Sequence, residues 1–229
     1  MKHSIKYFLY LFLQLSIMVC YAQKAEKIIL KSENFDTYNV SLKSETYKNK
    51  EALVAEQTVL KDSDKGYTFA RLKNMDFHNG IIEVTLAGQP KANAVEGARG
   101  FVGIAFRILS DTSKYEIIYL RPTNGRSEDQ FRRNHTTQYV SHPGYTWRKL
   151  RAETPSVYES YVDMVAGEWT KIKIEVKDDT AKLYVNGAVQ PTLIVNDLKQ
   201  GKDLRGSIGL WIDVSTLAQF TDLTVTKFD

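Results

Sequence analysis

The chain has 229 residues, with 31 Lys and Arg against 27 Asp and Glu, so its formal net charge is +4. This near balance argues against a nucleic-acid partner, because such proteins carry a clustered basic excess. Hydrophobic residues make up 43% and charged residues 25% of the chain, which is typical of a folded globular protein rather than a disordered one.

The first 22 residues, Met1–Ala22, are predicted to be a secretory signal peptide. Lys2 and Lys6 give the segment a positively charged start, and Tyr7–Val19 is mostly apolar. Cys20-Tyr21-Ala22 then supplies small residues suited to cleavage. The apolar run is too short to span a membrane comfortably. We therefore expect an exported protein, periplasmic or extracellular, with no transmembrane segment after cleavage.

Cys20 is the only cysteine of the chain. If cleavage follows Ala22, the mature protein has no disulfide, no thiolate metal site and no cysteine nucleophile. The alternative is lipid attachment at Cys20, although Val19 precedes it where lipoprotein signals usually have a small residue. No linker or fixed-period repeat divides the rest of the chain, so Gln23–Asp229 is predicted to form one domain.

Strand signals recur along the mature chain, with alternating apolar and polar residues and turn residues between the strands. Ile172, Ile174 and Val176, for instance, alternate with charged residues. The expected strands include 81–86, 101–109, 115–121, 169–177, 183–185, 207–213 and 221–228. So many short strands predict an all-β fold, a two-sheet antiparallel β-sandwich or jelly roll.

Two segments, 88–100 and 122–156, lack the strand pattern. The second is long for a loop and contains four aromatic residues, five arginines and two histidines. Disordered segments are poor in aromatic residues. We therefore expect 122–156 to be ordered and packed over another part of the chain.

The predicted hairpin of 101–121 has two unlike faces. A register that pairs Ala105 with Tyr119 places the mostly apolar even positions on a core face. The odd positions combine small residues with aromatic and charged ones: Gly103, Ala105, Arg107, Tyr115, Tyr119 and Arg121. Gly209, Trp211 and Asp213 repeat this pattern later in the chain.

The odd face is interpreted as a concave groove for a carbohydrate. Glycine inside a strand often marks the close approach of a ligand or of backbone. Aromatic rings pack on the C–H face of a sugar, while polar side chains hold its hydroxyls. The other interpretation is that these residues are ordinary cross-strand aromatic pairs with surface arginines.

Four motifs in the second half of the chain resemble the concanavalin A-like lectin/glucanase superfamily. They are Gly167-Glu168-Trp169, Tyr184-Val185-Asn186-Gly187, Gly206-Ser207-Ile208-Gly209 and Phe220-Thr221-Asp222-Leu223. Asn34-Phe35-Asp36 is similar to the N-terminal start of such domains. The resemblance implies a concanavalin A-like jelly roll with a concave binding face. Motifs of this kind specify a fold more than a function.

Within this superfamily the chain most resembles secreted bacterial domains of the 3-keto-disaccharide hydrolase type, through strand 115–121 and the Arg- and His-rich segment after it. The catalytic candidates are Glu116 and His135, the latter suited to proton transfer near neutral pH. The ligand-binding candidates are Arg107, Tyr119, Arg121, Arg133, Asn134, Gln138, Tyr139, Trp147, Trp211 and Asp213.

Other catalytic and metal-binding patterns are missing or incomplete in the sequence. The Glu-x-Asp-x-x-Glu run of family-16 glycoside hydrolases does not occur. Glu159 and Asp163 share a strand face but would lie about 13 Å apart, too far for a pair of glycosidase carboxyls. Many superfamily members hold a structural calcium ion, and Asp36 and Asp222 stand in the motifs that resemble that site. No zinc or dinucleotide motif is found.

Three functions follow from the sequence. The first is an exported domain that binds a glycan, with carbohydrate as the partner. The second is an enzyme that cleaves glycosides of keto-sugars from the same site. The third is a protein-interaction sandwich like laminin G-type domains, which predicts an exposed apolar patch. We favour the first.

Overall fold

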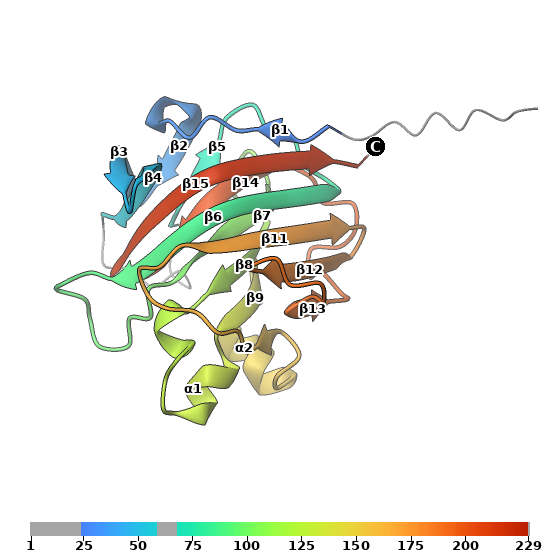
Figure 1. The fold of residues 1–229 in the computed structure, drawn as a ribbon. Helices are drawn as coiled ribbons and strands as arrows, with labels where there is room; N and C mark the ends of the chain where they lie inside the picture. The colour runs from blue at the N-terminus through green and yellow to red at the C-terminus, as the bar shows by residue number, and fades with distance from the viewer. Residues whose placement is uncertain (1–23, 59–67, 229) are drawn as a thin grey trace, which may run out of the picture.

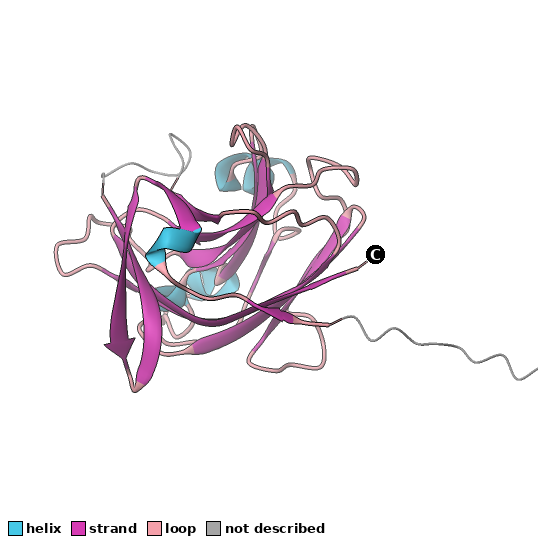
Figure 2. Cartoon of the chain, turned by 90° about the horizontal axis from the view of Figure 1, so that it is seen from above, coloured by secondary structure: helices cyan, strands magenta, loops and turns pink. Residues whose placement is uncertain are grey.

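Two antiparallel sheets face each other in the computed structural model, which describes residues 24–58 and 68–228 (Figures 1 and 2). The eight-stranded sheet has the order β13 (Leu193–Val195), β12 (Thr180–Val185), β11 (Thr170–Lys177), β6 (Gly80–Pro90), β15 (Thr216–Lys227), β4 (Lys50–Gln57) and β3 (Val40–Tyr47), and β1 (Glu26–Lys27) also pairs with β15. The seven-stranded sheet has the order β10 (Glu159–Ser160), β9 (Thr137–His142), β8 (Tyr115–Leu120), β7 (Val102–Ile108), β14 (Ser207–Ile212), β5 (Phe69–Leu72) and β2 (Phe35–Tyr38). The predicted all-β, two-sheet antiparallel sandwich is confirmed.

Short helices stand between some of the strands. They are η1 (Ser32–Asn34), η3 (Pro122–Asn124), α1 (Gln130–Asn134) and α2 (Trp147–Glu153). Helices α1 and α2 lie near β9 at the lower end of the molecule in Figure 1. The segment 122–156 therefore forms η3, α1, β9 and α2, and it packs against the sandwich as expected.

Alternation along β11 shows how the core is made. Ile172, Ile174 and Val176 are buried between the sheets, whereas Lys171 and Lys177 are exposed. The apolar side chains of β7 and β8 on the facing sheet belong to the same cluster. Burying one such aliphatic side chain contributes about 1.5–3 kcal/mol.

The register of β7 and β8 differs from the prediction by two residues. Tyr119 lies opposite Gly103 rather than opposite Ala105. Because side chains of a strand alternate with a period of two, a shift of two leaves every side chain on its predicted face. Val102 and Ile104 accordingly lie in the core between the sheets.

A β-bulge ends this alternation at Arg107. The residue has a φ of 54°, and the register between β7 and β14 shifts beside it. A bulge adds one residue to a strand and so exchanges the faces of the side chains beyond it. Ile108, expected in the core, therefore packs on the outer face of the seven-stranded sheet, and Arg107 is removed from that face.

An apolar cluster occupies the outer face of the seven-stranded sheet, where an open groove was predicted. Its buried members are Phe69, Ala105, Ile108, Tyr115, Ile117, Tyr119 and Trp211. A Cβ atom on Gly103 would lie 2.3 Å from the Ile118 carbonyl oxygen and 2.6 Å from Tyr119 Cα. Gly103 thus makes room for Tyr119, and the groove prediction is wrong along this stretch because aromatic side chains fill the space.

The predicted signal peptide, Met1–Ala22, lies outside the described residues, and so does Cys20 with its alternative of lipid attachment. Within residues 24–58 and 68–228, no helix has both the length and the apolar character needed to cross a membrane.

Candidate functional site

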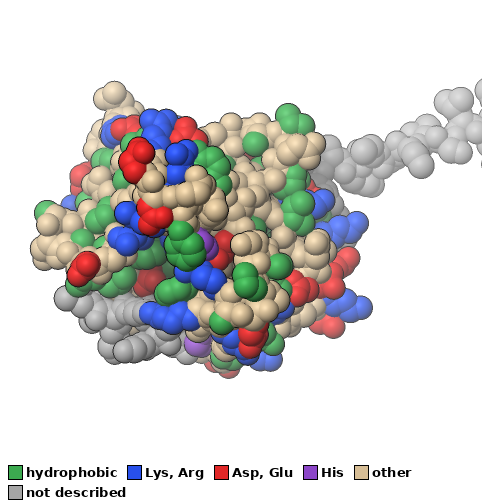
Figure 3. All heavy atoms as spheres, turned by 90° about the horizontal axis from the view of Figure 1, so that it is seen from below, with side chains coloured by type: hydrophobic (Ala, Val, Ile, Leu, Met, Phe, Trp, Pro, Cys, Tyr) green, Lys and Arg blue, Asp and Glu red, His purple; other side chains and the backbone are tan. Residues whose placement is uncertain are grey.

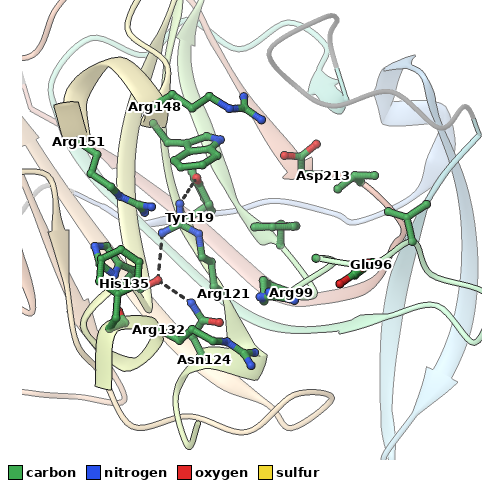
Figure 4. A pocket seen from close by; sticks show the side chains of 16 residues that line it. Glu96, Arg99, Tyr119, Arg121, Asn124, Arg132, His135, Arg148, Arg151 and Asp213 are labelled. Carbon is green, nitrogen blue, oxygen red and sulfur yellow. Dashed lines mark hydrogen bonds between the residues drawn. The ribbon is translucent and has the colours of Figure 1, made fainter. Parts of the chain in front are cut away.

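A pocket of about 440 Å³ opens near the ends of β8 and β14, beside the outer-face cluster (Figure 4). Its walls come from the loop before β7, from η3, from helices α1 and α2, and from the residues after β14. Five predicted site residues line it, namely Tyr119, Arg121, His135, Trp147 and Asp213.

Capped helices bring the 122–156 segment to this pocket. The Asp129 carboxylate accepts hydrogen bonds from the first backbone amides of α1, at 2.9 and 3.3 Å. The Thr146 hydroxyl caps α2 in the same way. Such caps satisfy amides that have no partner inside a helix. As a result, α1 presents Phe131 and Arg132 to the pocket and α2 presents Trp147.

Arg121 is the centre of a buried polar network on the pocket floor. Its Nη1 donates to the His135 carbonyl oxygen at 3.0 Å and lies 3.4 Å from Glu159 Oε1. Its Nη2 donates to the Tyr119 hydroxyl at 2.9 Å and to Gln138 Oε1 at 3.1 Å. Arg121 is only 5% exposed, so these contacts hold its guanidinium in one orientation.

Glu159 is the shared anionic partner of the cations behind the pocket. Its buried carboxylate accepts a hydrogen bond from Arg151 Nε at 3.0 Å, contacts Arg151 Nη2, and pairs with Arg121. It also lies 3.2 Å from His135 Nε2. The sequence did not reveal this role, because Glu159 comes from β10, 38 residues after Arg121.

His135 lines the pocket as predicted, but its ring is already engaged. Nδ1 donates to the Phe131 carbonyl oxygen, and Nε2 faces the carboxylate of Glu159. A general base needs a free lone pair within reach of the substrate proton. Both nitrogens of His135 face acceptor oxygens of the protein, so this geometry does not suit the predicted role as a base.

Glu116 lies away from the pocket, which corrects its assignment to the site. Its side chain points between the sheets, where it is fully buried. Its carboxylate accepts hydrogen bonds from the Tyr139 hydroxyl at 2.7 Å and from the Gln200 amide at 2.9 Å. Burial raises the pKa of Glu116, although these bonds oppose the shift. Glu116 and Tyr139 therefore hold the loop at Gln200 and do not reach a ligand.

The assignment of Arg107 to ligand binding is also corrected. Because of the bulge, its side chain is fully buried and does not line the pocket. Its guanidinium donates to the carbonyl oxygens of His78 and Asp178, both at 2.8 Å, to that of Gly201 at 3.3 Å, and to Asn79 Oδ1 at 3.0 Å. Arg107 thus ties together turns that lie far apart in the sequence.

The other predicted ligand-binding residues lie around the pocket without lining it. Arg133 donates to the Tyr161 hydroxyl at 3.2 Å, and Asn134 accepts from Gln130 at 2.7 Å. Gln138 lies behind Arg121. Trp211 packs 4.6 Å from the ring of Tyr119 and supports it from below. None of these four residues lines the pocket.

The two aspartates proposed for calcium do not form a site with each other. Asp36 pairs with Arg71 at 2.9 Å in the seven-stranded sheet, and Asp222 pairs with Lys50 at 2.9 Å in the eight-stranded sheet. Within the described residues, no group of three or more His, Cys, Asp or Glu side chains is arranged to hold a metal ion. These residues therefore do not fit the calcium site that the motifs implied.

Arginine dominates the charge of the pocket. Arg99, Arg121, Arg132, Arg148 and Arg151 line it, against the carboxylates of Glu96 and Asp213. Figure 4 shows Arg99 beside Glu96, and Arg151 with His135 on the side of the pocket away from Glu96 and Asp213. On the molecular surface that bears α1 and α2, Lys and Arg side chains lie among hydrophobic ones (Figure 3).

Aromatic and polar groups complete the lining. Phe131 is 62% exposed. Trp147 lies 4.6 Å from the guanidinium groups of both Arg148 and Arg151. Asn124 is 3% exposed; its Nδ2 donates to the His135 carbonyl oxygen at 3.1 Å, and its Oδ1 has no hydrogen-bond partner. The sequence carried no signal for Asn124, whose position depends on η3.

Known structures share this fold at low sequence identity. The carbohydrate-binding module CBM66 from Bacillus subtilis superposes with a TM-score of 0.55 at 12% identity, over 85% of this chain and 98% of that one. A protein of unknown function with a galectin-like fold, also from Bacillus subtilis, matches with a TM-score of 0.53 at 12% identity, over 83% and 89%. The fold is that of the concanavalin A-like jelly rolls.

A third known structure also has this fold. A putative glycosyl hydrolase from Parabacteroides distasonis has a TM-score of 0.50 at 13% identity, over 90% of this chain and 100% of that one. No family model matches the sequence, and a search of curated proteins finds no similar chain. At these identities the likeness shows the concanavalin A-like fold alone, since one fold hosts many functions. The narrower likeness to 3-keto-disaccharide hydrolases stays a prediction.

Proposed function

We propose that the chain is an exported carbohydrate-binding domain whose ligand occupies the pocket between β8, α1 and α2. The single observation that carries this is the combination of Phe131 and Trp147 with the unpartnered acceptor of Asn124 in one concave site. A sugar needs an apolar surface for its C–H face and fixed polar groups for its hydroxyls. The pocket also lies within the usual size range of small-molecule sites.

The surroundings of the two catalytic candidates favour binding over catalysis. Glu116 is sealed between the sheets, and both nitrogens of His135 face protein oxygens. CBM66, the carbohydrate-binding module with the same fold, gives this proposal fold-level support only.

The test is a calorimetric titration of the exported protein with neutral and acidic oligosaccharides. Phe131→Ala should weaken binding roughly tenfold while the melting temperature stays unchanged, because that ring is mostly exposed. Tyr161→Ala is the matched control, since Tyr161 is an exposed aromatic residue outside the pocket lining. Equal affinity of Phe131→Ala and the unaltered protein would contradict the proposal.

Glycoside cleavage is the second candidate function, and one observation favours it. The pocket holds two carboxyl groups on one side, those of Glu96 and Asp213, and most glycosidases work with two carboxyl groups. Mass spectrometry of the titrated oligosaccharides decides between the two candidates. Products that vanish in Asp213→Asn would establish cleavage, whereas intact sugars with saturable binding would exclude it for that panel.

Export is part of the proposal and rests on the pattern of Met1–Ala22. N-terminal sequencing of the protein recovered from its producing cells tests it. A chain that starts at Gln23 would establish cleavage after Ala22. A chain that starts at a lipid-modified Cys20 would show anchoring instead.

A further inference from the structure

The cations of the pocket fall into two groups. Arg121 and Arg151 share the carboxylate of Glu159, so each has an anionic partner inside the protein. Arg99 and Arg132 have no carboxylate within salt-bridge distance among residues 24–58 and 68–228. The only hydrogen bond of the Arg99 guanidinium there goes to the carbonyl oxygen of the neighbouring Ala98, at 3.1 Å.

The surroundings of Arg99 compensate its positive charge only in part. Burial lowers the pKa of Arg99, and repulsion from Arg132 and Arg121 lowers it further, with only Glu96 acting in the opposite direction. The guanidinium groups that line this cavity outnumber its carboxylates, so they repel one another, and a bound anion would offset that repulsion.

Two further polar atoms of the same cavity lack a partner. Six buried side-chain polar atoms of the described residues have no hydrogen-bond partner, and Asn124 Oδ1 and Arg132 Nε are two of them. The orientation of the Asn124 amide is set by its Nδ2, which donates to the His135 carbonyl oxygen. A buried polar group without a partner costs about 1–3 kcal/mol, so each such group calls for an explanation.

From this arrangement we infer that the pocket takes an acidic saccharide. The sugar's oxyanion, a carboxylate or a sulfate group, lies between Arg99 and Arg132 and accepts the hydrogen bond of Arg132 Nε. A hydroxyl of the same sugar donates to Asn124 Oδ1. This inference rests on the proposed function and adds the chemical class of the ligand to it.

Charge placement in the pocket agrees with such a ligand. Arg99 and Arg132 line the same cavity as Glu96 and Asp213. Carboxylates accept hydrogen bonds from neutral hydroxyls, and guanidinium groups bind oxyanions through paired donors. An acidic sugar presents an oxyanion and hydroxyls on one small ring, which an inorganic anion or a neutral sugar does not.

Isothermal titration at low and at high salt tests the inference with three probes. They are trigalacturonate, its neutral methyl ester, and a sulfated disaccharide of chondroitin. We expect trigalacturonate or the sulfated disaccharide to bind at least roughly tenfold more tightly than the ester, with affinity falling as salt rises. The chondroitin disaccharide carries a uronate carboxylate as well as a sulfate, so tighter binding of either acidic probe than of the ester supports an oxyanion site.

Two variants test whether the preference for the acidic probe depends on Arg99 and Arg132. Arg99→Gln and Arg132→Gln should each remove the preference for the acidic probe while the melting temperature of the free protein stays equal or rises. Arg205→Gln is the control for net charge, because Arg205 is exposed, pairs with Asp76 and lies outside the pocket. It should keep the preference.

Three outcomes separate the two proposals. Tighter binding of an acidic probe that depends on Arg99 and Arg132 supports both. Equal or tighter binding of the methyl ester overturns the acidic ligand and leaves the carbohydrate-binding function standing. Absence of binding by all three probes and by neutral oligosaccharides overturns both.

Discussion

The Nη2 of Arg121 donates to the hydroxyl of Tyr119 across 2.9 Å, and the guanidinium lies 5.0 Å from the centre of the Tyr119 ring. The two residues stand two positions apart, so they share the outer face of the seven-stranded sheet. Both are nearly fully buried, and burial raises the pKa of Tyr119 well above its ordinary value. The pocket floor is therefore a fixed, uncharged phenol held by a fixed cation.

Arg121→Ala should destabilise the protein by about 3 kcal/mol, because it removes the buried donor to Gln138 Oε1 and the Tyr119 hydroxyl and one of the cations that face Glu159. Urea denaturation measures the loss. Arg126→Ala is the matched control, since its ion pair with Asp163 is exposed and therefore adds little stability. Equal stability of the two variants would contradict the network. It also follows that Arg121→Ala cannot separate binding from folding.

Gly103→Ala should cost about 2–3 kcal/mol, because the added methyl group would meet the Ile118 carbonyl oxygen at 2.3 Å and the Tyr119 backbone at 2.6 Å. Ser44→Ala, at an exposed position of β3, should change stability by less than about 0.5 kcal/mol. Thermal unfolding of both variants checks this. An unchanged melting temperature for Gly103→Ala would mean that Tyr119 does not pack over this glycine.

Arg107→Met should destabilise the fold by about 3 kcal/mol or more. The methionine keeps the apolar stem but removes the guanidinium donors to three carbonyl oxygens and to Asn79 Oδ1, which keeps only the Asp178 amide as a donor. Arg107→Lys should rescue little, because an ammonium group lacks the planar fork of donors. Amide hydrogen exchange locates the effect, which we expect at the turns around Asp178 and Gly201. Exchange that changes only elsewhere would argue against this role.

Glu116→Gln should alter the pH dependence of stability. Since burial raises the pKa of Glu116 above its ordinary value of 4.5, the folded chain holds this proton to higher pH than the unfolded chain. The stabilisation is fully present below a pH of about 4.5 and is lost as pH rises through the folded-state value. The free energy of unfolding of the unaltered protein, minus that of the variant, should therefore fall as pH rises and then level off.

Urea denaturation over a pH series measures this difference. A difference that stays flat, or that grows with pH, would contradict the burial of an ionisable Glu116. Tyr139→Phe provides a second check, because it removes a hydrogen bond that lowers the pKa of Glu116. In that variant the decline should extend to higher pH.

The sequence predicted the faces of the strands better than their partners. Alternation placed Ile104, Ile118 and Tyr119 on the correct faces even though the register was wrong by two residues. It failed at Arg107 and Ile108, because a bulge inserts one residue and reverses the alternation. A non-glycine residue with positive φ leaves no mark in the pattern of apolar residues, so this reversal could not be foreseen.

The sequence also overstated the openness of the outer face. Small residues beside aromatic ones are compatible with an open groove and with a packed cluster. In the structure, Tyr119 and Trp211 pack against each other and belong to a buried cluster. Five of the predicted site residues nevertheless line the pocket, since they lie at strand ends or on the Arg-rich segment that covers them.

By itself, the sequence determined the two-sheet sandwich and the rich supply of aromatic and arginine side chains in 122–156, because periodicity and composition are properties of neighbouring residues. Only the tertiary structure decided which of those arginines have a carboxylate partner. Glu159 reaches Arg121 and His135 but not Arg99 or Arg132. Contacts of this kind depend on how segments far apart in the chain pack together. The interaction energy between two charges then depends on how deeply that packing buries them.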